Sequence, residues 1–174
     1  MKKKKDLLIL VNEKDEVLGY KEKIKCHLGK GLKHRAFSVF LFDNQGRLLI
    51  QKRAQGKMLW PGFWANTCCS HPRRGEGYIE AGERRVQEEL GIKASLRFLF
   101  KFSYQACYKD IGSENELCAV LVGKYQGDEI KPDPQEVAEW KFVDFKKLQE
   151  DIKKNPQKYA PWFKIEMKKI KNFL

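Results

Sequence analysis

Residues 36–43, Ala-Phe-Ser-Val-Phe-Leu-Phe-Asp, form the segment that most narrowly limits what this chain can fold into. A strand with one face in water alternates apolar and polar side chains, whereas this segment is almost entirely apolar on both faces. It therefore predicts a central strand that is buried from both sides. Asn44-Gln45-Gly46 predicts a turn, and residues 47–53 predict a second strand that forms a hairpin with the first.

The rest of the chain predicts helices on both sides of this sheet, as in an α/β sandwich. Residues 54–76 have no period and predict loops, which is where functional residues tend to lie. A helix is expected with Ile79, Val86 and Leu90 on one stripe and Gly91 after its end. The further strands expected lie near 6–11, 95–106, 114–125 and 137–143. Besides the helix over 77–90, one helix is expected to begin after Asp144 and another near Trp162.

No repeat or linker divides the chain, so we expect residues 1–174 to form one domain, with a basic tail over residues 1–6. The net charge of +12 is not arranged as a basic stripe between stacking aromatics, so a solvated Lys-rich surface and an anionic substrate explain it better than nucleic acid. No apolar run reaches the roughly 18–20 residues that span a bilayer, and we expect a cytoplasmic protein without a membrane partner. Five cysteines without a CxxC predict free thiols.

Cys69 and His71 are the first pair of residues that suggests chemistry. Side chains two residues apart in extended backbone point to the same side, so the thiol and the imidazole could share one pocket. An irregular loop that holds a cysteine and a histidine by chance explains the spacing equally well. Spacing alone leaves both interpretations open.

Glu114 and Glu116 form a second pair, in the segment Glu-Asn-Glu. If this segment is a strand, both carboxylates lie on one face, where they repel unless a cation lies between them or water solvates them. A metal would need nitrogen ligands as well, which the three histidines could supply. From the residues alone, a solvated edge strand is the favoured interpretation.

The helix over 77–90 carries two charge pairs at a spacing of four, Arg84 with Glu88 and Arg85 with Glu89. Ordinary ion pairs on a helix surface explain this spacing. The alternative is a site in which a carboxylate binds a hard divalent ion and an arginine binds phosphate oxygens.

This helix resembles the Nudix signature, Gly-x5-Glu-x7-Arg-Glu-U-x-Glu-Glu-x-Gly-U, in which U is aliphatic. The charged positions of the signature are matched by Glu76, Arg84, Glu88 and Glu89. Two positions depart from it: Ser70 replaces the first glycine, and Arg85 replaces the glutamate that supports hydrolysis in ordinary Nudix enzymes. The second departure argues against hydrolysis of a diphosphate.

The departures match one branch of that superfamily, the type I isopentenyl-diphosphate isomerases, which the chain resembles from about Leu8 to Trp162. The resemblance accounts for all three histidines. It implies a Nudix-like α/β/α sandwich with a mixed β-sheet, and interconversion of isopentenyl diphosphate and dimethylallyl diphosphate. The segments that carry it, in the family's order, are His27 with His34, His34-Arg-Ala-Phe-Ser38, Trp60-Pro-Gly-Phe-Trp64, Asn66-Thr-Cys-Cys-Ser-His-Pro72, Glu114-Asn-Glu116 and Tyr159-Ala-Pro-Trp162.

The resemblance implies that Cys69 and Glu116 transfer protons on either side of the substrate's double bond, with Tyr104 hydrogen-bonded near the glutamate. The chemistry agrees, because moving an unactivated double bond needs an acid and a base on opposite faces. A cation-like state must also be kept from water, and Trp162 would stabilise it by cation–π attraction. Cys68 should point away from the pocket.

The resemblance also implies two divalent ions and a diphosphate site. A Zn²⁺, Mn²⁺ or Mg²⁺ ion would be bound by His27, His34, His71, Glu114 and Glu116. A Mg²⁺ ion would bridge Glu89 to the diphosphate. The diphosphate would be bound by Lys23, Arg53, Lys57 and Arg85, with solvated surface as the alternative for the lysines. No flavin is expected, and the protein should act on a small allylic or homoallylic diphosphate as a monomer or weak homodimer.

Two other classes of function remain open. A Nudix diphosphate hydrolase is disfavoured by Arg85 and by the additional histidine, cysteine and glutamate residues. A non-catalytic basic binding domain is disfavoured because it has no need of paired carboxylates beside a thiol.

Overall fold

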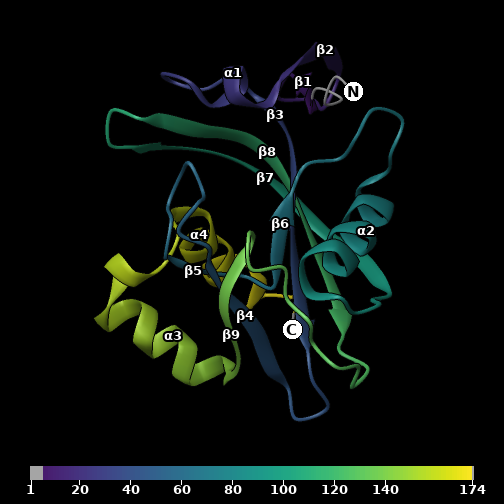
Figure 1. Ribbon diagram of the computed structural model, residues 1–174, viewed down its shortest axis with the longest axis vertical. Coiled ribbons are helices and arrows are strands. Elements are labelled where there is room, and N and C mark those ends of the chain that lie inside the picture. Colours follow the sequence, from purple (N-terminus) through teal and green to yellow (C-terminus); the bar gives the residue numbers. More distant parts are fainter. Residues whose placement is uncertain (1–5, 174) are drawn as a thin grey trace.

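The computed structural model describes residues 6–173, in which helices cover both faces of a mixed β-sheet (Figure 1). The predicted α/β sandwich with a mixed sheet is therefore confirmed. None of the helices in these residues is long and apolar enough to cross a membrane. The elements are β1 (Leu7–Val11), β2 (Val17–Glu22), α1 (Lys23–His27), β3 (His34–Phe42), β4 (Arg47–Arg53), β5 (Trp64–Ala65), β6 (Cys68–Ser70), α2 (Tyr78–Leu90), β7 (Leu96–Tyr108), β8 (Gly112–Lys124), β9 (Val137–Asp144), α3 (Phe145–Lys154), the 3₁₀ turn η1 (Pro156–Lys158) and α4 (Pro161–Ile170).

Strand β3 lies at the centre of the sheet. It pairs in parallel with β8 along its whole length, and antiparallel with β1, β4 and β6. Its side chains alternate between two cores, because successive residues of a strand point to opposite faces. Phe37, Val39 and Leu41 pack in the core that α2 covers, whereas Ala36 and Phe40 pack in the core that α3 and α4 cover. The predicted burial of this strand on both faces is confirmed.

The hairpin predicted for β3 and β4 is present only near its turn. Phe42 pairs with Leu48, and the two strands separate beyond that pair. Strand β6 then lies beside β3, while β4 pairs with β5 and β9. The separation places Cys69 directly opposite Ser38.

Helix α2 begins one residue later than predicted and ends as predicted, with Gly91 in the left-handed region at φ 71°. Val86 and Leu90 are buried as expected. Ile79 is 40% exposed, so its assignment to the buried stripe is wrong. Ala81 lies on the buried face instead, which rotates the stripe relative to the prediction.

The N-terminal part contains β1 as predicted, together with β2 and α1, which the sequence did not indicate. The predicted basic tail over residues 1–6 lies, except for its last residue, outside the described residues. The turn between β1 and β2 is attached to the sheet by Asp15, whose carboxylate accepts a hydrogen bond from Arg35 Nε at 2.6 Å and contacts Lys101. This attachment holds α1 and its His27 near β8.

The two C-terminal helices begin where the sequence indicates. The Asp144 side chain accepts a hydrogen bond of 2.9 Å from Lys147 N and so forms the predicted N-cap of α3. Pro161 is the first residue of α4, a position that needs no backbone N–H. The buried residues of α4 are Trp162, Phe163, Glu166, Met167 and Ile170.

Gly112 generates a prediction about how α1 is held. A Cβ atom added to Gly112 would lie only 2.3 Å from the carbonyl oxygen of His27. Gly112→Ala should therefore displace α1 and lower the free energy of unfolding by about 1–3 kcal/mol, as overpacking does. The matched control is Gly56→Ala, where an added Cβ meets nothing within 4 Å. Equal denaturant midpoints for the two variants would contradict this account.

Candidate active site and metal centre

Strands β3, β7 and β8 bring three functional groups side by side. Glu116 of β8 lies opposite His34 of β3 and opposite Tyr104 of β7. Tyr104 Oη donates a hydrogen bond of 2.5 Å to Glu116 Oε2, and His34 Nε2 lies 3.6 Å from Glu116 Oε1. Because β8 lies between two strands and Glu114 and Glu116 are each only 7% exposed, the interpretation as a solvated edge strand is wrong.

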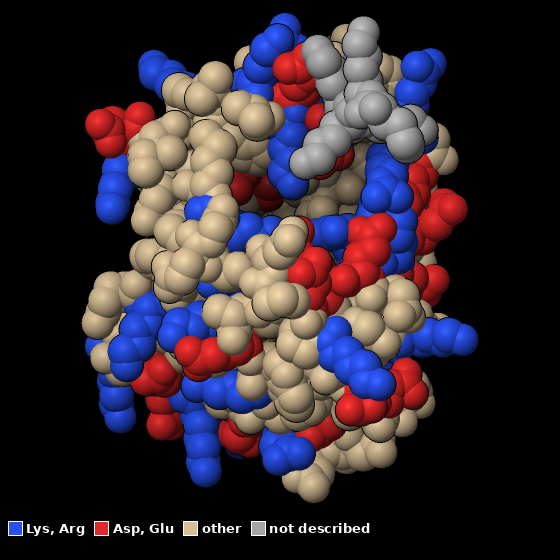
Figure 2. Space-filling view, in the orientation of Figure 1, with Lys and Arg blue, Asp and Glu red and all other residues tan. Residues whose placement is uncertain are grey.

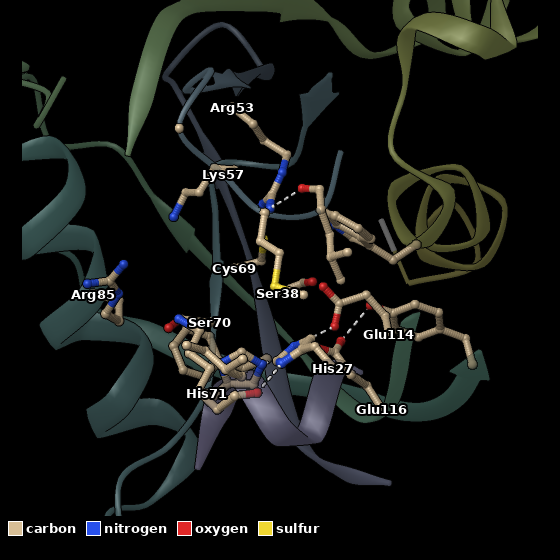
Figure 3. Close-up of a pocket in the computed structure, with 18 residues that line it drawn as sticks. His27, Ser38, Arg53, Lys57, Cys69, Ser70, His71, Arg85, Glu114 and Glu116 are labelled. Atoms are coloured by element: carbon tan, nitrogen blue, oxygen red, sulfur yellow. Dashed lines mark hydrogen bonds and ion pairs between the residues drawn. The ribbon is translucent and has the colours of Figure 1, made fainter. Parts of the chain in front are cut away.

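Two further histidines complete a cluster of imidazoles and carboxylates. His27 ends α1, and His71 follows β6. One ligand atom from each of the five residues lies within 4.8 Å of all the others. Figure 3 shows four of them, His27, His71, Glu114 and Glu116, gathered on one side of the pocket. The structure thus brings together the residues predicted as ligands of one metal, which are His27, His34, His71, Glu114 and Glu116.

Backbone contacts orient two of these imidazoles. Nδ1 of His27 lies 2.7 Å from the carbonyl of Lys23, and Nδ1 of His34 lies 2.7 Å from the carbonyl of Leu32. A carbonyl only accepts, so each Nδ1 carries a proton, and Nε2 is the nitrogen that each ring can offer to a metal ion. Among the described residues, His34 Nε2 is buried without a hydrogen-bond partner, and Glu114 Oε2 has only the Nε2 atom of His27 beside it, at 2.9 Å. Such orphaned donor atoms in a mixed nitrogen and oxygen set fit a divalent metal ion.

Burial and neighbouring charges set the protonation of the cluster. Burial, with His34 close by, holds the pKa of His71 well below its usual range. Burial also opposes the His27 cation, but the Glu114 carboxylate outweighs it and raises the pKa of His27. Burial opposes ionisation of Glu116 too, yet its hydrogen bonds and the nearby imidazoles lower its pKa overall. His71 is therefore neutral and Glu116 ionised, the forms in which each binds a metal.

The cluster lies at one end of a pocket of about 220 Å³. Figure 2 shows a hollow on this face with acidic side chains at its base and basic side chains around it. Ligand pockets for drug-sized molecules usually measure roughly 300–1,000 Å³, so this one suits a smaller ligand. The other predicted site residues that line it are Lys23, Arg53, Lys57, Cys69, Arg85, Tyr104 and Trp162.

Cys68 and Cys69 face opposite sides of the sheet. Cys68 is fully buried in the core that α2 covers, whereas Cys69 lines the pocket together with His71. Burial raises the pKa of the Cys69 thiol to about 12, although Arg53 opposes the shift. The thiol therefore carries its proton at neutral pH.

Arg53 is the cation most available to an anion in the pocket. Its Nη2 donates to the carbonyl of Leu59 at 2.9 Å, and its Nε donates to the carbonyl of Trp60 at 3.1 Å. Its guanidinium lies 5.1 Å from the ring centre of Trp162. No carboxylate of the described residues pairs with it, so its charge is not neutralised.

The other cations at the pocket already contact acids. Lys57 and Arg85 both pair with Glu136, and Lys23 lies 3.7 Å from Asp6. Lys23 is the most exposed of the three, with 43% of its side chain accessible. A bound anion would therefore have to compete with carboxylates at these positions.

The predicted charge pairs of α2 are both present, and they differ in kind. Arg84 Nη1 lies 3.1 Å from Glu88 on a partly exposed face. Arg85 Nη2 lies 2.5 Å from Glu89, which is only 3% exposed and also accepts a hydrogen bond from Gln51. Glu89 is not among the residues that line the pocket.

Two polar residues near the pocket were not given a role from the sequence. Ser38 lines the pocket, and Glu166 lies fully buried behind it. The sequence holds a signal for each residue, because Ser38 is the one polar residue in the otherwise apolar run of residues 36–42. Glu166 occurs four residues after Trp162, and so on the same face of the helix.

A model of the NUDIX domain matches residues 32–163, which is more than half of the chain. A crystal structure of a protein from Deinococcus radiodurans superposes with a TM-score of 0.77 at 21% identity, over 94% of this chain and 98% of that one. MutT protein from Methanosarcina mazei superposes with a TM-score of 0.67 at 16% identity, over 80% and 94%. These likenesses show the fold, and the domain match makes the chain a NUDIX protein.

Curated relatives narrow this class. Isopentenyl-diphosphate Delta-isomerase 1 of Photorhabdus laumondii is 43% identical over 145 residues, 82% of each sequence. Isopentenyl-diphosphate Delta-isomerase of Streptomyces griseus is 46% identical over 147 residues, 83% of this chain and 74% of that protein. The chain belongs to the isopentenyl-diphosphate Delta-isomerase family, which confirms the resemblance drawn from its motifs.

The cluster generates a prediction about metal content. His71→Ala and Glu114→Ala should each weaken metal binding by at least about tenfold, because even residues behind a ligand sphere contribute 10–100-fold. Elemental analysis after dialysis measures the bound metal. Glu139→Ala removes a carboxylate that is exposed and paired with Lys52, and it serves as the control. Unchanged metal content in both cluster variants would show that the ion is bound elsewhere.

Proposed function

We propose that this protein interconverts isopentenyl diphosphate and dimethylallyl diphosphate. The observation that carries the proposal is the placement of Cys69 and Glu116. They lie on β6 and β8, the two strands that flank β3, and both line the same small pocket. A protonated thiol and an ionised carboxylate then face one substrate, as a reaction that adds one proton and removes another requires.

Neighbouring residues support this pair. Tyr104 donates to Glu116 and so orients one oxygen of the carboxylate while the other stays directed at the histidines. Trp162 is 3% exposed and lines the pocket, where its ring would stabilise a tertiary cation-like state and keep water away. A cation formed next to water would instead be trapped as an alcohol.

The metal and the diphosphate have separate places in this proposal. The three histidines with Glu114 and Glu116 would hold one Zn²⁺, Mn²⁺ or Mg²⁺ ion, which would supply positive charge that fixes the Glu116 carboxylate. Arg53, Lys57, Arg85 and Lys23 would bind the diphosphate, with Mg²⁺ between it and Glu89. Because Glu89 is paired with Arg85 and lies outside the pocket lining, binding there requires that pair to rearrange.

We further propose that residues 1–174 act as one domain on this small diphosphate alone. Neither a flavin nor nucleic acid is part of the proposal, and the protein would work in the cytoplasm as a monomer or weak homodimer. The dispersed lysines are then a solvated surface that also attracts an anionic substrate.

The activity itself is the first test. Purified protein supplied with Mg²⁺ should convert isopentenyl diphosphate to dimethylallyl diphosphate without releasing phosphate. Both isomers and free phosphate are measured in the same incubation. Steady phosphate release with no isomer formed would favour the NUDIX hydrolase instead.

Adjacent cysteines offer an internal control for the proton-transferring pair. Cys69→Ala should lower kcat by about 10²–10⁴-fold, the usual loss when a residue that transfers a proton is removed. Cys68→Ala lies on the opposite face and should lower stability by about 1–2 kcal/mol while leaving kcat within about threefold. Steady-state kinetics and thermal unfolding separate the two effects. A fully active Cys69→Ala enzyme would remove Cys69 from the mechanism.

A further inference from the structure

Helix α4 buries a carboxyl group that the proposed reaction does not use. Glu166 is fully buried among the apolar residues of this helix. Its Oε1 lies 3.8 Å from Cys118 Sγ. Its Oε2 has no hydrogen-bond partner among the described residues. A buried acid with one unpartnered oxygen is costly to keep, which indicates a role beyond packing.

Ser38 connects this acid to the pocket. Its hydroxyl lies 3.5 Å from Cys118 Sγ, and the residue also lines the pocket. In the sheet, Ser38 of β3 lies directly opposite Cys69 of β6, so both side chains point to the same face a few ångströms apart. Figure 3 shows Ser38 and Cys69 next to each other in the pocket wall. A polar path therefore runs from Glu166 through the Cys118 thiol and the Ser38 hydroxyl to the side of the Cys69 thiol.

No positive group among the described residues pairs with Glu166. The groups that face it or act on it are Ser38 on β3, Cys118 and Glu116 on β8, and Cys69 on β6. Burial, together with the negative charge of Glu116, raises the pKa of Glu166 from the ordinary 4.5 to about 8. The carboxyl is therefore protonated at neutral pH, and it can both donate and accept a hydrogen bond.

We propose that Glu166 is a positioning residue, whose carboxyl acts through the Cys118 thiol to hold the Ser38 hydroxyl in the pocket wall beside Cys69. The inference rests on the proposed function of Cys69. A neutral acid suits this place, because it orients the hydroxyl without putting a second negative charge behind the thiol. An ionised carboxylate there would add to the charge of Glu116 on the same side of the sheet.

Kinetics of four variants and one control variant test this role. Glu166→Leu should lower kcat by about tenfold with KM within about threefold, because it removes the carboxyl that, through Cys118, orients Ser38. Ser38→Ala should give the same loss, and the double variant should be no worse than either single variant, since both remove one interaction. The conservative Glu166→Gln should recover most of the activity that Glu166→Leu loses. Met167→Leu, a buried change on the same helix outside the pocket, controls for altered packing.

A second measurement does not depend on activity. Between pH 4.5 and 8 the folded protein keeps a proton on Glu166 that the unfolded chain has lost, so this residue lowers stability as pH rises. Glu166→Gln has no such group, and its Tm advantage over the natural protein should grow from pH 5 to 8 and then level off. A constant Tm difference over this range would overturn the buried neutral acid. Additive losses in the double variant would overturn the link through Ser38.

Comparing the activity of the natural protein with that of Glu166→Leu also separates this inference from the proposed function. If the natural protein forms no dimethylallyl diphosphate, the proposed function fails and the positioning of Cys69 fails with it. If the natural protein is active but Glu166→Leu keeps its full kcat, only the inference fails.

Discussion

Burial of β3 on both faces is the constraint on which the rest of the structure depends. A strand that is apolar on both sides needs a covering layer on each, and the two cores then decide which face every neighbouring strand presents. Parallel pairing with β8 places Glu116 beside His34, and antiparallel pairing with β6 places Cys69 beside Ser38. A slip of one residue would turn each of these groups to the wrong face. The packing of the core therefore also sets the geometry of the chemistry.

The site gathers groups that do not stabilise the fold. Three imidazoles and two carboxylates lie within a few ångströms of one another, and His34 and Glu114 each bury an atom without a hydrogen bond. A buried polar group left unsatisfied costs about 1–3 kcal/mol, so the two cores on either side of the sheet must offset this. Glu166 adds a further buried acid near the same pocket. Groups that are unfavourable in the fold by themselves gather where a ligand can satisfy them. Here the carboxylates and imidazole nitrogens fit a positively charged ligand.

Some features of the fold could be predicted from the sequence because they depend only on neighbouring residues. The end of α2 at Gly91 and the cap at Asp144 follow from backbone preferences, and both were confirmed. Whether Glu114 and Glu116 face water could not be read from alternation, which is the same for a buried and an exposed strand. That choice depends on which strands lie beside β8, a long-range property. Only the resemblance to a family, which rests on motifs in a fixed order, predicted that the three distant histidines lie at one site.

Strand β2 was missed for a different reason, since Gly19 and mixed polar residues leave it without a strand pattern. Ile79 was misplaced because the buried face of α2 is rotated toward Ala81, which leaves Ile79 on the exposed side.

Glu136 affects which anions can bind in the pocket. Its carboxylate contacts both Lys57 and Arg85, so two of the cations at the entrance are already occupied. A singly charged anion such as chloride or bicarbonate gains little by displacing it, because one negative charge merely replaces another. An anion with several charges gains more, and one that arrives with its own divalent ion also compensates for the carboxylate it displaces. Glu136 therefore competes with any anion that approaches Lys57 and Arg85, and at these two cations it favours an anion with several charges over a small singly charged one.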